Sequence, residues 1–291
     1  MSSTAALTKQ DFRFFHRLRV RWAEVDLQKI VFNAHYLMYL DTAIADYWRA
    51  LMLPYEAAMH QLQGDLYVKK SGLEFHASAR YDDILDIGLS CTRIGNSSMT
   101  FVGGIFRGAE LLITGELIYV FADPATQTSR PVPQVLRQIL TDFEANKPMH
   151  QLQVGSWADL KHWALPLRME VFVEEQQVPP ELELDDDDAQ AVHAVVTNGM
   201  GMPIATGRLV QQAPGVSRLG RMAVTRVLRA ERLGSMVLQA LTDAAVRRGD
   251  REVVLHAQRH AQSFYARAGF LAHGEPFDEA GIAHIEMRRT L

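Results

Sequence analysis

Cysteine is nearly absent from this sequence: Cys91 is the only one among 291 residues. A single cysteine can form neither an intrachain disulfide nor a multi-cysteine zinc site, so both are excluded. Cys91 lies in the alternating apolar stretch LDIGLSCTRI, a pattern typical of a β-strand. We therefore expect it to be a small residue of the core or of a sheet.

An excess of positive charge is also lacking, because 30 Lys and Arg residues stand against 34 Asp and Glu residues, a net charge of −4. Nucleic acids and anionic membranes are therefore not expected as partners. No apolar run approaches the roughly 20 residues of a membrane span. Residues 1–22 also lack the apolar centre of a signal peptide, so we expect a cytoplasmic protein.

A polar segment around residues 142–155 (DFEANKPMHQLQVG) divides the chain. It combines Pro, Asn and Gly with few apolar residues and has no periodicity. The length of the chain is enough for two domains that each bury a core. We place the boundary between Lys147 and Pro148, which predicts domains at 1–147 and 148–291.

The first half predicts an antiparallel sheet laid over one long helix. Apolar residues recur at steps of three and four over residues 33–51, so one face of that helix is buried. A short strand precedes it in HRLRVRWAEVD, and a second helical stretch follows in PYEAAMHQLQG. The later segments are rich in β-branched and aromatic residues, and short connections at residues 95–96 and 107–108 fit hairpins.

The second half predicts a mixed sheet with flanking helices. An early helix (DLKHWALPLRMEVFVEEQQ) and an acidic loop precede antiparallel strands, a helix over residues 233–248, the strand EVVLHAQ and the helix AQSFYARAG. Arg247 and Arg248 in the last turn, with Gly249 beyond them, mark the end of the long helix. The predicted class of the whole chain is α+β in two domains.

A lone carboxylate, Asp26, lies shortly before the long helix of the first half. The free N–H groups and positive dipole end of a helix N-terminus favour a developing oxyanion, so a carboxylate there could act on an electrophile held by those amides. Asp is also common at turns and helix starts, where it only caps the backbone. The spacing alone favours the capping role.

Residues 21–41 resemble the active-site segment of hotdog-fold acyl-CoA thioesterases of the 4-hydroxybenzoyl-CoA thioesterase type. The residues at matching positions are Asp26, Tyr36, Tyr39 and Asp41, and EFHASARYDDILDIGLS resembles the family's second strand block. The resemblance covers roughly residues 12–140 and implies a hotdog fold, an acyl-CoA thioester substrate and a homodimer or homotetramer formed through this domain. It further implies that Asp26 is a nucleophile or general base, and that the Asn33 N–H polarises the thioester carbonyl.

This sequence departs from the thioesterase pattern at two positions. The family commonly has Gly where Lys29 stands, and His or Tyr where Asn33 stands. Lys29 could change the loop geometry or meet a phosphate or carboxylate of the substrate. His35, two residues after Asn33, could supply an imidazole or face a dimer seam.

A strand, a basic loop and a helix that begins near Gly234 follow one another over residues 218–235. Such an end presents backbone N–H groups to a pyrophosphate, with the helix dipole assisting. Arg229 and Arg232 in the loop are equally typical of a solvated basic surface. Glycines at 199 and 201 complete neither a dinucleotide fingerprint nor a P-loop.

Several blocks of the second half, in order, resemble the GNAT superfamily of N-acetyltransferases, and its ElaA-like branch in particular. They are LRMEVFVEEQQVP, ELDDDD, LGRMAVTRVLRAERLGS, LHAQRHAQSFYARAGF and FDEAGIAHIEMRR, and they cover nearly all of residues 152–290. The resemblance implies a GNAT fold and transfer of an acetyl group from acetyl-CoA, a substrate, to an amine acceptor. No tightly bound cofactor and no metal are expected.

The GNAT resemblance also implies roles for individual residues. Backbone groups of Met222, Ala223 and Val224 would align the pantetheine arm, and Tyr265 would protonate the departing thiolate, for which a phenol of pKa near 10 is suited. The loop and helix start that would hold the pyrophosphate consist of Arg229, Ala230, Arg232, Leu233, Gly234 and Ser235. The superfamily usually has Gly at the positions of Ala230 and Arg232.

The base that would deprotonate the amine is not identified by the sequence. The candidates, chosen only by their motif neighbourhoods, are Glu174, Glu175, His193 and His284. The expected identity of each is nevertheless a surface carboxylate or a satisfied core histidine. The aspartates at 185–188 could meet a cationic acceptor or a metal, although a hydrated loop is the expected role of such a run. His256 and His260 straddle a strand-to-helix change, so no metal pair is predicted there.

The sequence as a whole predicts a fused enzyme whose halves both bind acyl-CoA. We expect the first half to prefer longer or aromatic acyl chains, because hydrolysis of acetyl-CoA would drain the donor of the second half. The alternative is that one half is a non-catalytic acyl-CoA sensor or assembly module, which the departures at Lys29 and Ala230 favour.

Overall fold

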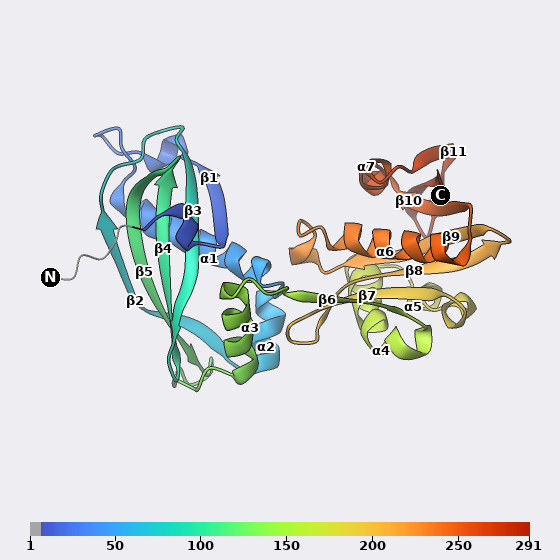
Figure 1. The fold of residues 1–291 in the computed structure, drawn as a ribbon, viewed down its shortest axis with the longest axis horizontal. Helices are drawn as coiled ribbons and strands as arrows, with labels where there is room; N and C mark the ends of the chain where they lie inside the picture. The colour runs from blue at the N-terminus through green and yellow to red at the C-terminus, as the bar shows by residue number, and fades with distance from the viewer. Residues whose placement is uncertain (1–6) are drawn as a thin grey trace. The chain divides into compact units, whose positions relative to one another are not determined.

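The computed structural model describes residues 7–291, so the beginning of the first predicted domain, residues 1–6, lies outside the described residues. The chain divides into two compact units, residues 1–149 and 150–291 (Figure 1). The polar segment around 142–155 is partly regular, because one helix ends at Glu144 and a strand begins at His150.

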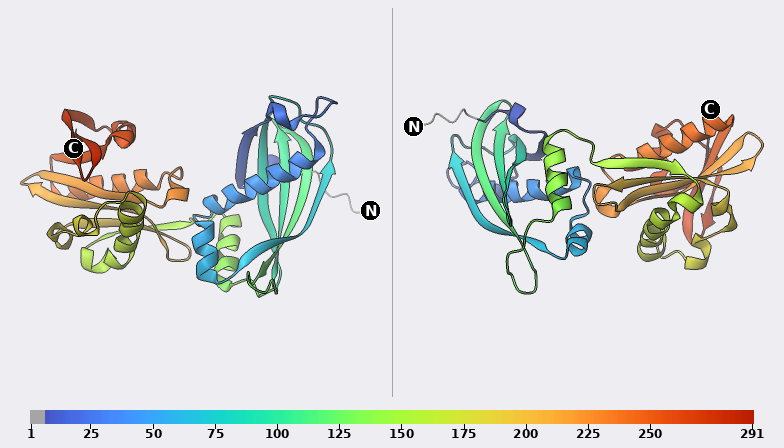
Figure 2. Two further views of the ribbon diagram at one scale, coloured as in Figure 1. Left: turned by 180° about the vertical axis from the view of Figure 1, so that it is seen from behind. Right: turned by 60° about the horizontal axis from the view of Figure 1, so that its bottom comes forward.

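The first unit is a five-stranded antiparallel sheet in the order β1-β3-β4-β5-β2 around one long helix (Figure 2). Its strands are β1 (Phe14–Arg19), β2 (Asp65–Phe75), β3 (Ile84–Ile94), β4 (Ser98–Arg107) and β5 (Glu110–Ala122). Its helices are α1 (Asn33–Ala50), α2 (Tyr55–Leu62) and α3 (Gln134–Glu144), with short 3₁₀ turns η1 (Lys9–Asp11) and η2 (Trp22–Glu24). The predicted sheet over a long helix is confirmed, and Cys91 is buried in β3.

Helix α1 approaches the sheet closely because glycines lie beneath it. Leu40 is fully buried on the inner face of α1, and Gly103 of β4 is paired with Gly115 of β5. A Cβ at Gly103 would lie 2.5 Å from Leu40 Cδ2, and one at Gly115 would lie 2.4 Å from Leu40 Cδ1. No side chain other than hydrogen fits at either position, so these glycines set the depth of α1.

The second unit is a seven-stranded sheet in the order β11-β12-β10-β9-β8-β7-β6. Its strands are β6 (His150–Gly155), β7 (Val192–Asn198), β8 (Pro203–Ala213), β9 (Val216–Val224), β10 (Glu252–Gln258), β11 (Leu271–Glu279) and β12 (Ile282–Thr290). Neighbours pair antiparallel except β9 and β10, which are parallel. The predicted mixed sheet, and with it the α+β class, is confirmed.

Helices α4 and α6 cover opposite faces of this sheet (Figure 1). The helices of the unit are α4 (Trp157–Arg168), the π-helix η3 (Met169–Glu175), α5 (Pro180–Glu183), α6 (Leu233–Arg248) and α7 (Gln262–Arg267). The 3₁₀ turns are η4 (Asp186–Ala189), η5 (Arg226–Leu228) and η6 (Arg259–Ala261). Helix α6 ends as predicted, with Gly249 in the left-handed conformation (φ 87°). Over residues 7–291, each helix is too short or too polar to cross a bilayer.

Candidate functional site

Asp26 lies in the loop that leads into α1 and is partly buried. Its Oδ1 atom accepts a hydrogen bond from Gln28 N at 2.8 Å, and its carbonyl accepts one from Lys29 N at 3.0 Å. One carboxylate oxygen therefore caps a turn, which is the role that the spacing alone favoured. The other oxygen, Oδ2, has no hydrogen-bond partner within residues 7–291 and is free to contact a substrate or water.

Lys29 stands where the resembled family commonly has glycine, and its backbone is left-handed, with φ 62°. That region favours glycine because an L side chain crowds the backbone there. The loop thus keeps the conformation that a glycine would adopt, and the lysine occupies it under strain.

Glu24, which sequence reasoning missed, holds this loop against α1. Its carboxylate is buried and accepts hydrogen bonds from the Tyr39 hydroxyl and the Arg21 N–H, each at 2.7 Å, while its carbonyl accepts Phe32 N at 3.0 Å. Burial alone would raise the pKa of Glu24, but these hydrogen bonds and the charge of Arg21 lower it, so the group stays ionised. The i, i+3 spacing of Arg21 and Glu24 was the available signal.

The N-terminus of α1 has no side-chain cap. Phe32 is the N-cap residue and makes no side-chain capping hydrogen bond. The N–H groups of Asn33 and Ala34 lie in the first turn, where a helix provides no acceptor of its own. Asn33, whose amide is predicted to face the thioester carbonyl, is an exposed residue.

The other matching positions of the first unit have separate roles. Burial raises the pKa of Tyr36, the charge of nearby Asp26 adds to the effect, and the Tyr36 hydroxyl accepts Ala79 N at 2.8 Å. His35 stacks on Tyr39 with ring centroids 6.4 Å apart. Asp41 is exposed about 12 Å along the helix axis from Asn33, so it is not part of the site at the helix start within this unit.

In the second unit, β9 and β10 diverge next to the predicted pantetheine segment. The parallel ladder pairs Leu219 with Leu255 and ends there, although β9 continues to Val224 and β10 to Gln258. Beyond Leu219, β9 is paired with β8 alone, through Gly220, Ala223 and Val224. The edge of β9 that faces away from β8 therefore has no partner strand in this stretch, although its Val224 carbonyl accepts a hydrogen bond from Arg229 Nε at 3.2 Å.

The start of α6 and helix α7 meet at the end of β9. A Cβ placed on Gly234 would lie 3.5 Å from Phe264 Cζ and 3.6 Å from Val224 Cγ2. Arg232, the N-cap of α6, is left-handed (φ 58°) and makes no side-chain capping bond. The structure thus brings together the predicted pantetheine strand, the first-turn N–H groups of α6 and the helix that carries Tyr265.

Arg229 is engaged by a carboxylate in this structure. Its guanidinium donates two hydrogen bonds to Glu175, Nη1 to Oε1 and Nη2 to Oε2, each at 2.6 Å. The Arg229 guanidinium lowers the pKa of Glu175. A diphosphate at the α6 start would compete with Glu175 for Arg229. Ala230, between Arg229 and the helix, is exposed.

Tyr265 is buried between aromatic neighbours, with ring centroids 4.9 Å from Phe264 and 6.1 Å from Phe270. Within residues 7–291 its hydroxyl has no hydrogen-bond partner. Burial raises the pKa of Tyr265 to about 12, which keeps the phenol protonated near neutral pH. The Tyr265 hydroxyl therefore carries a proton at neutral pH.

The candidates for a base in the second unit have mostly structural surroundings. His193 is buried and donates from Nε2 to the Asp188 carbonyl at 3.0 Å, as expected of a satisfied core histidine. His284 donates from Nδ1 to the Ile282 carbonyl at 2.7 Å. Glu174 is exposed. None of these contacts assigns a base.

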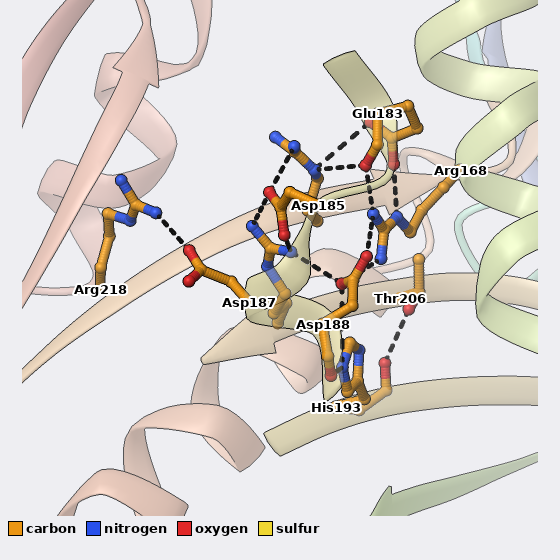
Figure 3. Close-up of polar contacts among 11 residues, drawn as sticks. Arg168, Glu183, Asp185, Asp187, Asp188, His193, Thr206 and Arg218 are labelled. Atoms are coloured by element: carbon orange, nitrogen blue, oxygen red, sulfur yellow. Dashed lines mark hydrogen bonds and ion pairs between the residues drawn. The ribbon is translucent and has the colours of Figure 1, made fainter. Parts of the chain in front are cut away.

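The acidic run at 185–188 is a hydrated loop only in part: Asp186 is exposed, but the other three aspartates pair with arginines. Asp188 is 2% exposed and accepts hydrogen bonds from Arg168 Nη1 at 2.8 Å and Arg208 Nη1 at 2.7 Å. Glu183 is equally buried and is bonded to Arg168. Figure 3 shows these carboxylates meeting the arginines in one network. The prediction failed for Asp185, Asp187 and Asp188 because their arginine partners lie on other elements of the fold, which the local composition does not reveal.

A metal centre does not explain this acidic network. Over the described residues, no group of three or more His, Cys, Asp or Glu side chains is arranged to hold a metal ion. His256 is hydrogen bonded through Nδ1 to Glu279 Oε2 at 2.9 Å. The arginines balance the carboxylates instead of a cation.

Comparison with known proteins gives a separate result for each unit. Residues 28–114 match the family model described as the thioesterase superfamily, and residues 161–291 match the model of the acetyltransferase (GNAT) domain. The N-acetyltransferase YjcF of Bacillus subtilis, described as uncharacterized, is 35% identical over 43% of this chain and 89% of its own. Protein ElaA of Escherichia coli is 30% identical over 46% of this chain and 96% of its own.

The first unit is similar to a solved structure. The crystal structure of Slr0204 from Synechocystis, described as a 1,4-dihydroxy-2-naphthoyl-CoA thioesterase, is 19% identical with a TM-score of 0.42, over 45% of this chain and 97% of its own.

Proposed function

Since the chain belongs to the GNAT acetyltransferase family through its second unit and carries a thioesterase-superfamily domain in its first, we propose that it is a bifunctional acyl-CoA enzyme. The first unit would hydrolyse an acyl-CoA thioester. The second would transfer an acetyl group from acetyl-CoA to an amine. The observation that carries the proposal is the meeting of the diverging β9 edge, the α6 start and the Tyr265 helix at one place.

In the second unit, acetyl-CoA would extend along the free edge of β9. Backbone groups of residues 222–224 would pair with the amides of the pantetheine arm, as a neighbouring strand would. The first-turn N–H groups of α6 at Leu233, Gly234 and Ser235 would hold the pyrophosphate, because they lack acceptors and lie at the positive end of the helix dipole.

Transfer needs a proton at the sulfur. When the amine nitrogen attacks the carbonyl carbon, the C–S bond breaks and a thiolate departs. The phenol of Tyr265, with a pKa of about 12, is protonated at neutral pH and would donate its proton to that sulfur. The proton released by the attacking amine goes to a base that we leave unassigned.

In the first unit, the thioester carbonyl would lie at the start of α1. The N–H of Asn33 would donate to the carbonyl oxygen, whose negative charge grows as the tetrahedral intermediate forms. Asp26 would attack the carbonyl carbon or take a proton from the attacking water, through the Oδ2 atom that has no partner within residues 7–291.

Hydrolysis of an acyl-CoA panel by the wild-type chain and Asp26→Asn tests the first activity. We expect the variant to lose at least about 10²-fold in kcat, the lower end of what a positioned acid or base contributes. Glu116→Gln, which alters an exposed carboxylate paired with Lys70, is the matched control. Equal rates for wild type and Asp26→Asn would remove Asp26 from catalysis.

The acyl preference of the hydrolase is also a proposal. If both units acted freely on acetyl-CoA, the first would consume the donor of the second. We therefore expect longer or aromatic acyl chains to be hydrolysed best. Acetyl-CoA as the best hydrolytic substrate would contradict this expectation.

A second candidate function is supported by the strain at Lys29 and the Arg229–Glu175 pair. Either feature could reflect a unit that binds acyl-CoA without turnover and serves as a sensor or assembly module. Binding of CoA at the first unit without hydrolysis of any thioester, alongside active acetyl transfer, would favour this function over the bifunctional one.

We further propose assembly into a homodimer or homotetramer through the first unit. Strand β2 is an edge strand of 11 residues, and Val68 and Phe75 on it are exposed. Long edges with apolar side chains readily pair with another strand. A monomer by light scattering that still hydrolyses thioesters would contradict this assembly.

A further inference from the structure

Arg221 occupies an irregular point of β9, one residue before the segment proposed to align pantetheine. It has a left-handed backbone with φ 51°. On the neighbouring strand β8, Arg208 is paired with Gly220 and Thr206 with Ala223, so Arg221 and Met222 together face one residue, Gly207. This is a β-bulge, which inserts an extra residue and redirects the strand after it.

The bulge decides which backbone groups face the free edge of β9. A shift of one residue in a strand exchanges its two faces and edges. Beyond the bulge, Ala223 packs with Leu167 and Val171 on the α4 side. A Cβ at Gly207 would lie 2.5 Å from Met222 Sδ and 2.8 Å from Val237 of α6, which places Met222 on the α6 side.

The side chain of Arg221 binds the bulge to the end of α5 and to Asp185, just after that helix. Its Nη2 atom donates to the Leu182 carbonyl at 2.9 Å and its Nε atom to the Glu183 carbonyl at 3.2 Å. Nη2 also donates to Asp185 Oδ2 at 3.1 Å. These acceptors lie far from Arg221 in the sequence, so the bulge and the segment hold each other in place.

Asp185 joins the two strands on either side of the bulge. The same Oδ2 atom that accepts Arg221 also accepts Arg208 Nη2 at 2.8 Å, and Arg208 projects from β8 opposite Gly220. Arg208 is in turn bonded to Asp188, which is bonded to Arg168 of α4. The segment that receives Arg221 is therefore fixed by charged groups that are themselves buried.

We propose that Arg221 is a positioning residue for acetyl-CoA: clamped by residues 182–185, it sets the bulge that presents the backbone of residues 222–224 to the pantetheine arm. This inference rests on the proposed function of the second unit. Arg221 acts through the backbone and does not itself contact the reacting atoms. The ionic network around Asp185 thus serves CoA binding as well as stability.

The test follows CoA binding at the second unit of the full chain by hydrogen exchange and mass spectrometry. Protection of peptides that span residues 222–236 reports CoA binding at the second unit, separately from any CoA bound at the first unit. The CoA concentration for half-protection is compared for wild type, Arg221→Ala, Asp185→Asn and the control Arg218→Gln. Arg218 lies on the same strand and pairs with the partly exposed Asp187 at 3.0 Å, away from the bulge.

We expect Arg221→Ala to raise the CoA concentration for half-protection by about tenfold or more, which corresponds to about 1.4 kcal/mol. Asp185→Asn should shift it in the same direction, and it leaves β9 unaltered in sequence. Arg218→Gln should bind as the wild type does. Adenosine 3′-phosphate 5′-diphosphate, which lacks the pantetheine arm, should protect the α6 start equally in wild type and both bulge variants.

The outcomes separate this inference from the proposed function. A wild-type chain whose 222–236 peptides gain no protection from CoA overturns the proposed function and this inference with it. Wild-type protection with unchanged affinity in Arg221→Ala and Asp185→Asn overturns the inference alone. Equally weakened binding of CoA and of adenosine 3′-phosphate 5′-diphosphate in these variants also overturns the inference, because that pattern indicates general loss of structure.

Discussion

Lys29 donates its backbone N–H to the carbonyl of Asp26 at 3.0 Å, and it does so from a left-handed conformation with φ 62°. Lys29 thus closes the turn that presents the Asp26 carboxylate, although its side chain crowds the backbone in the left-handed conformation that this turn requires. Glycine at this position would close the same turn without the crowding.

Lys29→Gly is therefore expected to stabilise the chain. Relief of the left-handed strain gains about 1–2 kcal/mol, and the added freedom of glycine in the unfolded chain removes about 0.5–1 kcal/mol. The expected net gain is about 0.5–1 kcal/mol in the free energy of unfolding, measured by urea denaturation. Lys29→Ala is the control, since it removes the charge and keeps the strain. Equal stability of the Gly and Ala variants would contradict the explanation.

Glu24→Gln is expected to loosen the loop before α1. The carboxylate accepts hydrogen bonds from Arg21 N and the Tyr39 hydroxyl in a buried place, and the replaced oxygen would leave a donor unsatisfied. The expected loss is about 1–3 kcal/mol of unfolding free energy, with slower thioester hydrolysis.

A matched control for Glu24 is Glu110→Gln, which alters an exposed carboxylate paired with Arg107 at 2.7 Å. A surface pair of this kind contributes about 0–1 kcal/mol. Similar losses for the two variants would show that burial of Glu24 does not matter.

Asp188→Asn is expected to destabilise the second unit in a pH-dependent way. Burial by itself would raise the pKa of Asp188, but hydrogen bonds from Arg168 and Arg208 and their charges lower it. A group whose pKa is lower in the folded state adds stability above its unfolded value, near 4, and loses that contribution as the pH falls through the folded value. At pH 7 the variant should lose about 3–5 kcal/mol, because buried guanidinium groups lose their partner.

The neighbouring Asp187 provides the control for that experiment. Asp187→Asn removes a partly exposed partner of Arg218 and should cost at most about 1 kcal/mol. Urea denaturation at pH 7 and near pH 3 compares the two variants with the wild type. If the deficit of Asp188→Asn did not shrink at the lower pH, the ionised carboxylate would not be the source of the stability.

The pH profile of acetyl transfer tests Tyr265. Because burial raises the pKa of Tyr265 to about 12, the proton stays on the phenol up to about pH 11. The kcat measured with a panel of primary amines should therefore show no loss between pH 8 and 10 that depends on Tyr265. Tyr265→Phe should lower kcat by about 10²-fold or more while the affinity for acetyl-CoA stays unchanged. An alkaline decline near pH 9 that disappears in Tyr265→Phe would oppose this role.

Local patterns predicted the elements that depend on nearby residues. The spacing of apolar residues over 33–51 predicted α1, and Arg247, Arg248 and Gly249 predicted the end of α6. The predicted role of His193 as a satisfied core residue was also confirmed. Each of these depends on periodicity, capping or composition within a few residues.

Contacts between distant segments could not be predicted in the same way. Glu24 meets Tyr39 of α1, and Asp188 meets Arg208 of β8, across separations of 15 and 20 residues. The sequence indicated the acidic run but not which of its carboxylates would be buried, and it assigned Glu24 no role. Packing against arginines of other strands made part of the predicted hydrated loop at 185–188 a network of ion pairs.

The amino-acid sequence alone determined that the chain joins an antiparallel sheet on one long helix to a mixed sheet with flanking helices. The periodicity of its apolar residues also located the main helices and strands. Only the tertiary structure decided which charged side chains are paired. Glu24, Asp188 and Arg221 acquire their roles from partners on other elements. The reason is physical, because periodicity is a property of neighbouring residues, whereas desolvation and pairing of charge arise only when remote segments pack together.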